Sequence, residues 1–441
     1  MASTYLSRTQ TSGNSKTFTY SGWLKRGNPT AGERPFFTAS SDSNNRSSFM
    51  FESGDTLRLY NIDGGSVNVN LITTQLFRDY SAWYHIVLAV DTTQATASDR
   101  VKFYVNGEQV TSFSSSTYPN QNVNMKMNSA ISHLLGHAPF SGSYYDGSMS
   151  HVHFIDGTAY DASAFGETDA TTGIWKPKTA PSVTYGTNGF FLKFENSGSM
   201  GTDSSGNGNN FTVNGTMTQT IDTPSNVFAT LNPLVPQGVS FSNGNNVAIT
   251  SGASWKSCFS TIGFSSGKWY FEAKINSLLF VQFGIMNAQQ VLGSAQLFMD
   301  SSGGYSYHQD GAKGNNGTST AGYGNTFTSG DIISVAFDAD NGTIWFGKNG
   351  TWQNSATQSE IENGTTTNSA FSGISTSQTY MFAVSLYNPC NVSLNFGNGY
   401  FGTTAVSSAE NPDDGIGIFE YTVPTGYKAL CTKSINAQEY A

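Results

Sequence analysis

Residues 331–352 have the sequence DIISVAFDADNGTIWFGKNGTW and predict two β-strands joined by a tight turn. Apolar residues alternate with smaller or polar residues over 333–337, which is the period of a half-buried strand. Asp-Asn-Gly at 340–342 tolerates the positive φ angles of a two-residue hairpin turn, and Asn-Gly at 349–350 forms another turn. The stretch therefore predicts a β-hairpin that is followed directly by a second turn.

The same order of features occurs earlier in the chain. Residues 85–91, HIVLAVD, predict a strand that ends in Asp, and residues 101–107, VKFYVNG, predict a second strand that ends in Asn-Gly. In the first module strands recur at short intervals, and we expect no helix there apart from a turn near 162–165. The chain is interpreted as two all-β modules built on the same pattern.

Composition limits the class of protein. A chain of 441 residues predicts two or three domains, each large enough to bury a core. Aromatic residues make up 13% of the chain, which argues against a disordered protein despite the many Gly, Ser, Thr and Asn residues. Charged residues make up 12%, about half of the usual ~25%, so neutral polar side chains must cover most of the surface.

Charge and hydropathy exclude several functions. The net charge is −9 and no run of Lys or Arg exists, so we expect no nucleic-acid partner. The apolar runs are far shorter than the ~20 residues of a membrane span, and the N-terminus lacks the apolar region of a signal peptide. The three cysteines have no metal spacing and predict buried thiols, with a Cys258–Cys390 bridge as the alternative.

The first half resembles the laminin-G/concanavalin A-like jelly roll. The motifs are WYHI at 83–86, FYVNG at 103–107 and DGSMSHVHFIDG at 146–157. The version found in phage virion proteins, especially of marine phages, also matches at 5–9, 23–27, 165–167, 175–178 and 203–212. The resemblance covers residues 3–216 and implies an antiparallel β-sandwich.

The second half resembles a SPRY domain. The family's elements match GKWYFE at 267–272, GDII at 330–333, FGKNG at 346–350 and the two strands within 382–397. Phe382 departs from the proline that the family often has at this place. The SPRY fold is itself a concanavalin-like sandwich, which accounts for the repeated pattern of strand, Asp, turn and strand.

The predicted fold class is all-β, with two concanavalin A-like antiparallel sandwiches in tandem and a short C-terminal tail. The predicted boundaries are 1–216 for the jelly roll, 217–240 for a Pro-containing linker, 241–402 for the SPRY-like sandwich and 403–441 for a docking tail. Residues 419–423 of the tail predict a strand. The tail's apolar side chains need a partner, either the protein's own sandwich or another subunit.

Catalytic motifs are missing from the sequence. Hydrolases of the concanavalin fold use a Glu-x-Asp-x-x-Glu strand, which places the acid and the nucleophile on one face. The nearest string, Glu167-Thr-Asp169, lacks the third carboxylate and lies in a predicted loop. We therefore expect that the protein is not an enzyme and has no catalytic residues.

Metal sites are weakly indicated. His133, His137, His151 and His153 could converge on zinc, but packing or surface histidines are favoured because no acidic or Cys partner has ligand spacing. The laminin-G resemblance implies that the Asp-Gly pair at 146–147 or at 156–157 could bind calcium, although turn formation explains both pairs. We assign no metal ligand and no cofactor, with calcium as the alternative.

Two loops combine aromatic and polar residues, as carbohydrate sites on β-sandwiches do. For each loop the alternative is a tyrosine that caps the edge of the sandwich. The candidate ligand-binding residues are Tyr144, Tyr145 and Asp146 in the first module and Tyr305, Tyr307 and His308 in the second. Trp269, Trp345 and Phe346 are expected in the core.

These features lead to an interpretation of function. The favoured reading is a non-enzymatic phage virion protein, made in the host cytoplasm and displayed on the particle as a tail-associated or capsid-decorating component. Its expected partners are other virion proteins and host-surface glycans, in an oligomeric assembly. The alternatives are a secreted polysaccharide-binding lectin or glycoside hydrolase of the concanavalin fold, and an architectural protein without a ligand. The host, the receptor and the place on the particle are left open.

Overall fold

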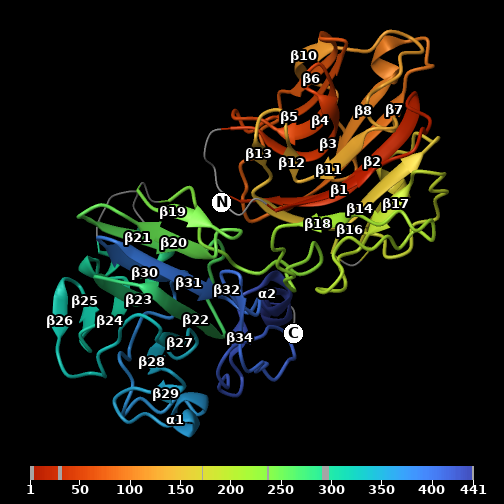
Figure 1. Cartoon of the computed structure of the whole chain (residues 1–441). Helices are drawn as coiled ribbons and strands as arrows, with labels where there is room; N and C mark the ends of the chain where they lie inside the picture. Colours follow the sequence, from red (N-terminus) through yellow and green to blue (C-terminus); the bar gives the residue numbers. More distant parts are fainter. Residues whose placement is uncertain (1–3, 28–31, 171, 236–237, 291–296, 440–441) are drawn as a thin grey trace. The chain divides into compact units, whose positions relative to one another are not determined.

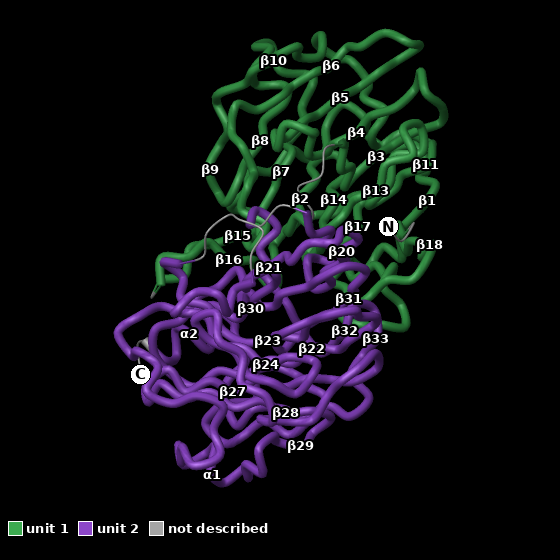
Figure 2. The backbone as a smooth tube through the Cα atoms, turned by 90° about the vertical axis from the view of Figure 1, so that its left-hand side faces the viewer, with its two compact units in different colours: residues 1–219 green, residues 220–441 purple. Residues whose placement is uncertain are grey.

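The structure is a computed structural model that describes residues 4–27, 32–170, 172–235, 238–290 and 297–439. The chain forms two compact units, Met1–Gln219 and Thr220–Ala441 (Figure 2). Strands dominate both units and pair almost entirely in antiparallel fashion, which confirms the predicted all-β fold class. Within the described ranges no helix has both the length and the apolar character needed to cross a membrane.

Unit 1 is a sandwich of an eight-stranded and a six-stranded sheet (Figure 1). The eight-stranded sheet has the order β10 (Phe113–Thr117), β6 (Ser66–Thr73), β5 (Leu57–Asp63), β4 (Asn45–Phe51), β3 (Arg34–Asp42), β11 (Ser132–Leu135), β1 (Tyr5–Thr9) and β18 (Thr212–Asn214). The six-stranded sheet has the order β17 (Phe190–Leu192), β14 (Gly147–Asp156), β2 (Thr17–Arg26), β7 (Trp83–Asp91), β8 (Val101–Val105) and β9 (Glu108–Gln109). Side chains from both sheets, such as Phe49 and Phe154, fill the core between them.

Short elements complete unit 1. Two small two-stranded sheets are β12 (His137–Ala138) with β13 (Ser143–Tyr144), and β15 (Gly166–Thr168) with β16 (Trp175–Pro177). Two 3-10 turns are η1 (Ala97–Asp99) and η2 (Ala162–Ala164). The predicted turn near 162–165 is therefore confirmed.

Unit 2 is a second sandwich. Its larger sheet has the order β19 (Ser240–Ser242), β20 (Val247–Thr250), β31 (Cys390–Asn395), β22 (Lys268–Ser277), β27 (Ile332–Asp338), β28 (Thr343–Lys348) and β29 (Thr351–Trp352), and β34 (Lys428–Ala429) also pairs with β22. The smaller sheet has the order β21 (Trp255–Phe259), β30 (Tyr380–Tyr387), β23 (Phe280–Asn287), β24 (Gly304–His308), β25 (Lys313–Asn315) and β26 (Thr318–Thr320). The remaining elements are β32 (Tyr400–Phe401), β33 (Thr404–Ala405), η3 (Ala288–Gln290), η4 (Phe298–Asp300), α1 (Gln358–Glu362) and α2 (Thr432–Glu439).

The hairpin predicted at 331–352 is β27–β28, and β29 follows its second turn. The first turn differs from the prediction, because residues 339–342 form a four-residue loop in which only Gly342 has a positive φ. Asp338 shapes this loop, since its Oδ1 accepts the N–H groups of Asp340 and Asn341 at 3.1 and 3.0 Å. The second turn is a two-residue turn as predicted, with φ of 49° at Asn349 and 77° at Gly350.

An asparagine bridge at the second turn occurs in both units. In unit 2 the Asn349 N–H donates to the carbonyl of Ile332, while its Oδ1 accepts the Ile332 N–H, both at 2.8 Å. In unit 1 Asn106 makes the same two bonds to His85, at 2.9 and 2.8 Å. Each Asn also has a positive φ, a conformation that asparagine tolerates better than most residues. The repeated sequence pattern therefore corresponds to a repeated hydrogen-bonded unit.

The C-terminal tail covers the outer face of the larger sheet of unit 2. The predicted half-buried pattern is wrong here, because Ser334, Ala336 and Trp345 on that face are as buried as the core-facing residues between them. Phe419 and Tyr427 from the tail pack in one apolar cluster with Trp345. The protein's own sandwich is thus the partner of the tail's apolar side chains.

Segment 220–240 also belongs to unit 2 rather than lying outside both units. Phe228, Ala229 and Leu231 are buried there. The Ala229 N–H donates to the carbonyl of Leu430 at 2.9 Å, so this segment and the tail lie side by side. The unit boundary follows Gln219, close to the predicted end of the first module at residue 216.

Glu272 of β22 fixes the tail on this face. Its carboxylate accepts the N–H groups of Glu420 and Tyr421 at 2.8 and 2.9 Å, and the Tyr270 hydroxyl donates to it at 2.9 Å. These N–H groups pair with a side chain rather than with a strand, and the predicted strand at 419–423 is absent. Complete burial raises the pKa of Glu272 to about 7, against the opposing effect of its hydrogen-bond donors.

The asparagine bridges predict unit-specific effects of substitution. Asn349→Ala removes the acceptor for the Ile332 N–H and places alanine at a positive φ, so it should destabilise unit 2 by about 1–2 kcal/mol. Amide exchange should speed up at Ile332 and stay unchanged at His85, whereas Asn106→Ala should give the reverse. Asn349→Gly is the control, since it keeps the backbone conformation and removes only the acceptor. Unchanged exchange at Ile332 in Asn349→Ala would contradict this role.

The raised pKa of Glu272 predicts that stability falls as pH rises through about 7. The folded chain keeps a proton that the unfolded chain releases near the ordinary pKa of 4.5, so the stabilisation is complete below that value and is lost above 7. Urea unfolding should show a loss of about 3 kcal/mol between pH 4.5 and 8. Glu272→Gln, whose side chain does not titrate, should flatten the profile.

The exposed Glu195 provides the matched control. Glu195→Gln should keep the profile of the wild type, because its side chain lies in unit 1 and is largely in solvent. Parallel profiles for Glu272→Gln and the wild type would show that Glu272 does not cause the pH dependence.

Candidate binding pocket in the second unit

The three candidate residues of the first predicted loop lie in different environments. Tyr144 is half-buried and its ring stacks on His137, with 4.2 Å between ring centroids. Tyr145 packs against the core, its hydroxyl donates to the carbonyl of Lys25 at 2.9 Å, and burial raises its pKa. The Asp146 carbonyl accepts the Gly27 N–H at 2.8 Å. Tyr145 therefore braces strand β2, and Tyr144 keeps a partly open ring.

The second predicted loop does not form a joint platform. Tyr307 is completely buried between the sheets, and Tyr305 is half-buried against Phe371 on the same side of β24. His308 points to the opposite side, because successive residues of a strand face opposite ways. Its Nε2 lies 2.8 Å from Ser306 Oγ, and burial lowers its pKa. Tyr307 is thus a core residue, for which sequence alone suggested an exposed ring.

Protein groups occupy the polar atoms that could have held a metal. Asp156 accepts hydrogen bonds from Asn14 N–H and Asn128 Nδ2 at 2.8 and 2.6 Å, and from Asn188 N–H at 3.1 Å. Burial lowers the pKa of His133 to about 4, so it is neutral at pH 7. Among the described residues, no group of three or more His, Cys, Asp or Glu is placed to hold a metal. The three cysteines are buried and free.

The acidic pair at 167–169 is also occupied. Lys176 Nζ lies 2.9 Å from Asp169 Oδ2 and 3.8 Å from Glu167 Oε1, across the β15–β16 pair. Glu272 is shielded from solvent, and the nearby Glu420 turns its carboxylate to Ser407. Neither place offers two free carboxylates on opposite sides of a bond, which glycoside hydrolysis requires.

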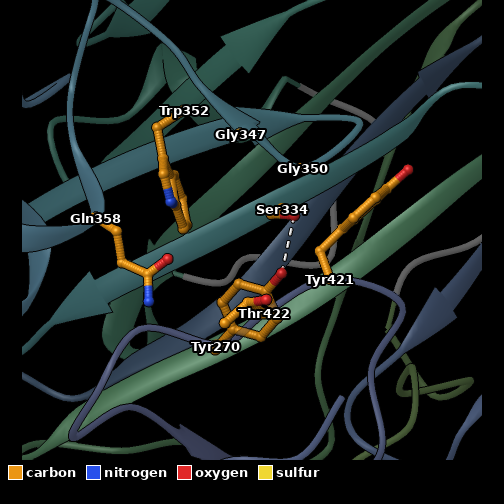
Figure 3. A pocket seen from close by; sticks show the side chains of 8 residues that line it. All are labelled: Tyr270, Ser334, Gly347, Gly350, Trp352, Gln358, Tyr421 and Thr422. Carbon is orange, nitrogen blue, oxygen red and sulfur yellow. Dashed lines mark hydrogen bonds between the residues drawn. The ribbon is translucent and has the colours of Figure 1, made fainter. Parts of the chain in front are cut away.

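A small pocket opens between the larger sheet of unit 2 and the tail (Figure 3). It encloses about 150 Å³. Its lining residues come from β22, β27, the β28–β29 turn, α1 and the tail, and are Tyr270, Ser334, Gly347, Gly350, Trp352, Gln358, Tyr421 and Thr422. Sequence reasoning placed no ligand here, because the pocket exists only once the tail lies on the sheet.

Glycines let two aromatic rings form the walls. A Cβ at Gly347 would lie 3.3 Å from the ring of Trp352, so that ring rests directly on β28. A Cβ at Gly350 would lie 2.8 Å from Cδ1 of Tyr421, which rests on the turn in the same way. In the view of Figure 3 the Tyr270 and Ser334 side chains lie between Trp352 and Tyr421.

Hydrogen bonds fix the polar groups of the pocket. The Tyr270 hydroxyl lies 2.9 Å from both Ser334 Oγ and Glu272 Oε1. Gln358 opens helix α1, where Thr357 and Glu360 form a capping box, and its Nε2 donates to Glu362 Oε1 at 2.9 Å. The capping-box sequence is the signal that could have revealed this helix from sequence.

No lining side chain of the pocket is ionised at neutral pH. Burial raises the pKa of both Tyr270 and Tyr421, and the remaining lining residues are Trp, Gln, Ser, Thr and Gly. The arrangement therefore offers aromatic rings, hydroxyls and a carboxamide, which together suit a neutral group that has one apolar face and several hydroxyls.

Comparison with protein families supports both modules. The model described as the Concanavalin A-like lectin/glucanases superfamily matches residues 2–163, and the SPRY domain model matches residues 268–399. Tyr421 and Thr422, which complete the pocket, lie beyond the SPRY match. No curated protein matches the chain.

Solved structures show weaker similarity. The SPRY domain of human HERC1 is 19% identical over 35% of this chain and 91% of its own, with a TM-score of 0.28. A human SPRY domain is 18% identical over 36% and 94%, with a TM-score of 0.27, and stonustoxin is 16% identical over 38% and 27%, with a TM-score of 0.28. The two family models identify a laminin-G/concanavalin A-like domain in the first unit and a SPRY domain in the second.

Proposed function

We propose that the protein is a non-enzymatic binding protein whose second unit recognises a neutral sugar unit of a glycan. Both domain types indicate a binding module. The observation that carries the proposal is the pocket between Trp352 and Tyr421, where two aromatic walls meet hydroxyl and carboxamide groups. Aromatic faces pack on the C–H face of a sugar ring, and the polar groups orient its hydroxyls.

The size of the pocket limits what it holds. Sites for drug-sized ligands occupy about 300–1,000 Å³, so about 150 Å³ suits one terminal ring rather than an oligosaccharide. The uncharged lining disfavours phosphate, sulfate and acidic sugars, because nothing on it offsets the loss of water around an anion. A terminal neutral sugar is therefore the ligand class that fits.

We further propose that the protein is displayed on a phage particle. Its support is the set of sequence motifs in residues 3–216 that resemble modules of phage virion proteins, together with a charged fraction of only 12%. On the particle the protein would bind host-surface glycans or neighbouring virion subunits. Two rigid sandwiches with many loops suit such a display role.

The pocket predicts a binding defect in Trp352→Ala. On a glycan array, the variant should lose binding to its neutral ligands by about tenfold or more, since it removes one aromatic wall. Trp352→Phe should retain most of the signal, because it keeps a ring on Gly347. Equal array profiles for Trp352→Ala and the wild type would remove the pocket from the proposal.

A reducing-sugar assay on every bound polysaccharide tests the non-enzymatic part. The expected result is no release of reducing ends, because the candidate acids are paired or buried. Turnover of any polysaccharide by the purified protein would favour the glycoside-hydrolase alternative instead.

The particle location predicts that antibodies raised against the purified chain label intact phage particles. Labelling should persist after the particles are washed at high salt, since the protein has few charges with which to attach nonspecifically. Particles from which peptides of this chain are absent by mass spectrometry would argue against a virion role, and would leave the sugar pocket unaffected.

A further inference from the structure

An aromatic trio, defined as Trp255, Phe280 and Tyr387, lies on the outer face of the smaller sheet of unit 2. The three residues sit on adjacent strands, where Tyr387 of β30 is the register partner of both Trp255 of β21 and Phe280 of β23 (Figure 1). Their ring centroids are 5.3 to 6.4 Å apart. The trio is therefore one compact group of rings and not three separate side chains.

The trio faces solvent rather than the core. Val281 follows Phe280 and Leu386 precedes Tyr387, and both are fully buried between the sheets. Because successive residues of a strand face opposite ways, the trio must point away from the core. Phe280 remains 42% exposed and the adjacent Leu279 44% exposed, and Trp255 and Tyr387 are half-buried. A cluster of large rings held in this open position has no role in the core of the sandwich.

A buried polar row lies directly beside the trio on the same face. Ser257, Ser385 and Gln282 are each two residues from a member of the trio and are paired in register across the strands. The two serine hydroxyls lie 2.6 Å apart, and Ser385 Oγ also accepts the Phe298 N–H of η4 at 3.3 Å. Gln282 is only 2% exposed, and its Oε1 has no hydrogen-bond partner. An unpaired buried acceptor costs about 1–3 kcal/mol, so it needs a reason beyond folding.

The three strand segments that carry the trio are uncharged. Residues 249–255, 276–282 and 385–392 contain no Asp, Glu, Lys or Arg, and the adjoining turn, whose Gln309 N–H donates to the Val281 carbonyl at 3.2 Å, adds one acidic residue, Asp310. Lys256 follows Trp255 in β21 and so points to the other side of the strand. Single-stranded nucleic acids and acidic peptides need positive charge beside the stacking rings, and this surface provides none.

From these observations we infer that the trio and Gln282 form a second carbohydrate site, specific for a neutral polysaccharide chain. The rings stack on the apolar faces of sugar units, and rotation of the Gln282 side chain brings its unpaired Oε1 from the buried position to a sugar hydroxyl. The site is an open surface, so it takes an internal stretch of chain, whereas the Trp352 pocket takes a single ring. It stands independently of that pocket, with which it shares no residue.

Affinity electrophoresis of the full chain tests the inference. Native gels would contain hydroxyethylcellulose, dextran or galactomannan, with alginate as the acidic comparison. We expect retardation by at least one neutral polymer and none by alginate. Trp255→Ala and Phe280→Ala should each weaken this retardation by about tenfold. The matched control is Val67→Ala, which removes a similarly exposed apolar side chain from β6 of unit 1 and should change nothing.

Gln282→Leu separates a binding role from a structural one. If Oε1 serves a ligand, the variant weakens retardation while its melting temperature is unchanged or higher, because an unpaired buried acceptor has been removed. Full retardation in Gln282→Leu, or in both ring variants, would overturn the inference. The absence of retardation in all three neutral gels would also overturn the inference. That result is expected if the trio instead mediates self-association.

Trp352→Ala distinguishes this site from the proposed pocket. Retardation that persists in Trp352→Ala and disappears in Trp255→Ala supports the trio, whatever the glycan array shows for the pocket. Retardation that depends on Trp352 and not on Trp255 would overturn the second site and leave the proposed function intact.

Discussion

The outer face of unit 2 depends on one buried carboxylate. An ionised or polar group inside a protein is tolerated when donors satisfy it, and Glu272 receives two backbone N–H groups and one hydroxyl. The same bonds determine the path of the tail, because Glu420 and Tyr421 give their N–H groups to a side chain rather than to a strand. The tail therefore covers the outer face of the sheet, and the ring of Tyr421 packs against Gly350. The position of the Glu272 carboxylate therefore determines where Tyr421 forms one wall of the pocket.

Both sandwiches use the side chain of an asparagine to satisfy a backbone N–H group of a neighbouring strand. The N–H of His85 in β7 and that of Ile332 at the start of β27 each need an acceptor, and the Oδ1 of Asn106 or Asn349 provides it from the turn that ends the next strand. Few residues combine a side-chain carbonyl with tolerance of positive φ, so the Asn-Gly pair is strongly constrained in both places. The similarity of the two units therefore reaches the level of single hydrogen bonds.

Sequence periodicity predicts the strands well, because the alternation of apolar and polar residues indicates which face of a strand is buried in a sandwich. The core residues Trp269 and Phe346 agree with this pattern, whereas Trp345 is buried on the second face, beneath the tail. The pattern could not show that the second face of β27 and β28 is also buried, since that depends on a tail that lies far away in sequence. Tyr307 was misjudged for a related reason, because a tyrosine whose hydroxyl finds the Asn325 carbonyl can be buried completely.

The residues that form the two candidate sites share a feature that single motifs do not reveal. Trp352 and Tyr421 are brought together by the folding of the tail, and Trp255, Phe280 and Tyr387 by the register of three strands. No two members of either set are neighbours in sequence. Both sets consist of uncharged side chains, in a chain whose charged fraction is only 12%. Stacking and hydrogen bonding are then the interactions left for recognition, and this is the chemistry that separates neutral glycans from charged ligands.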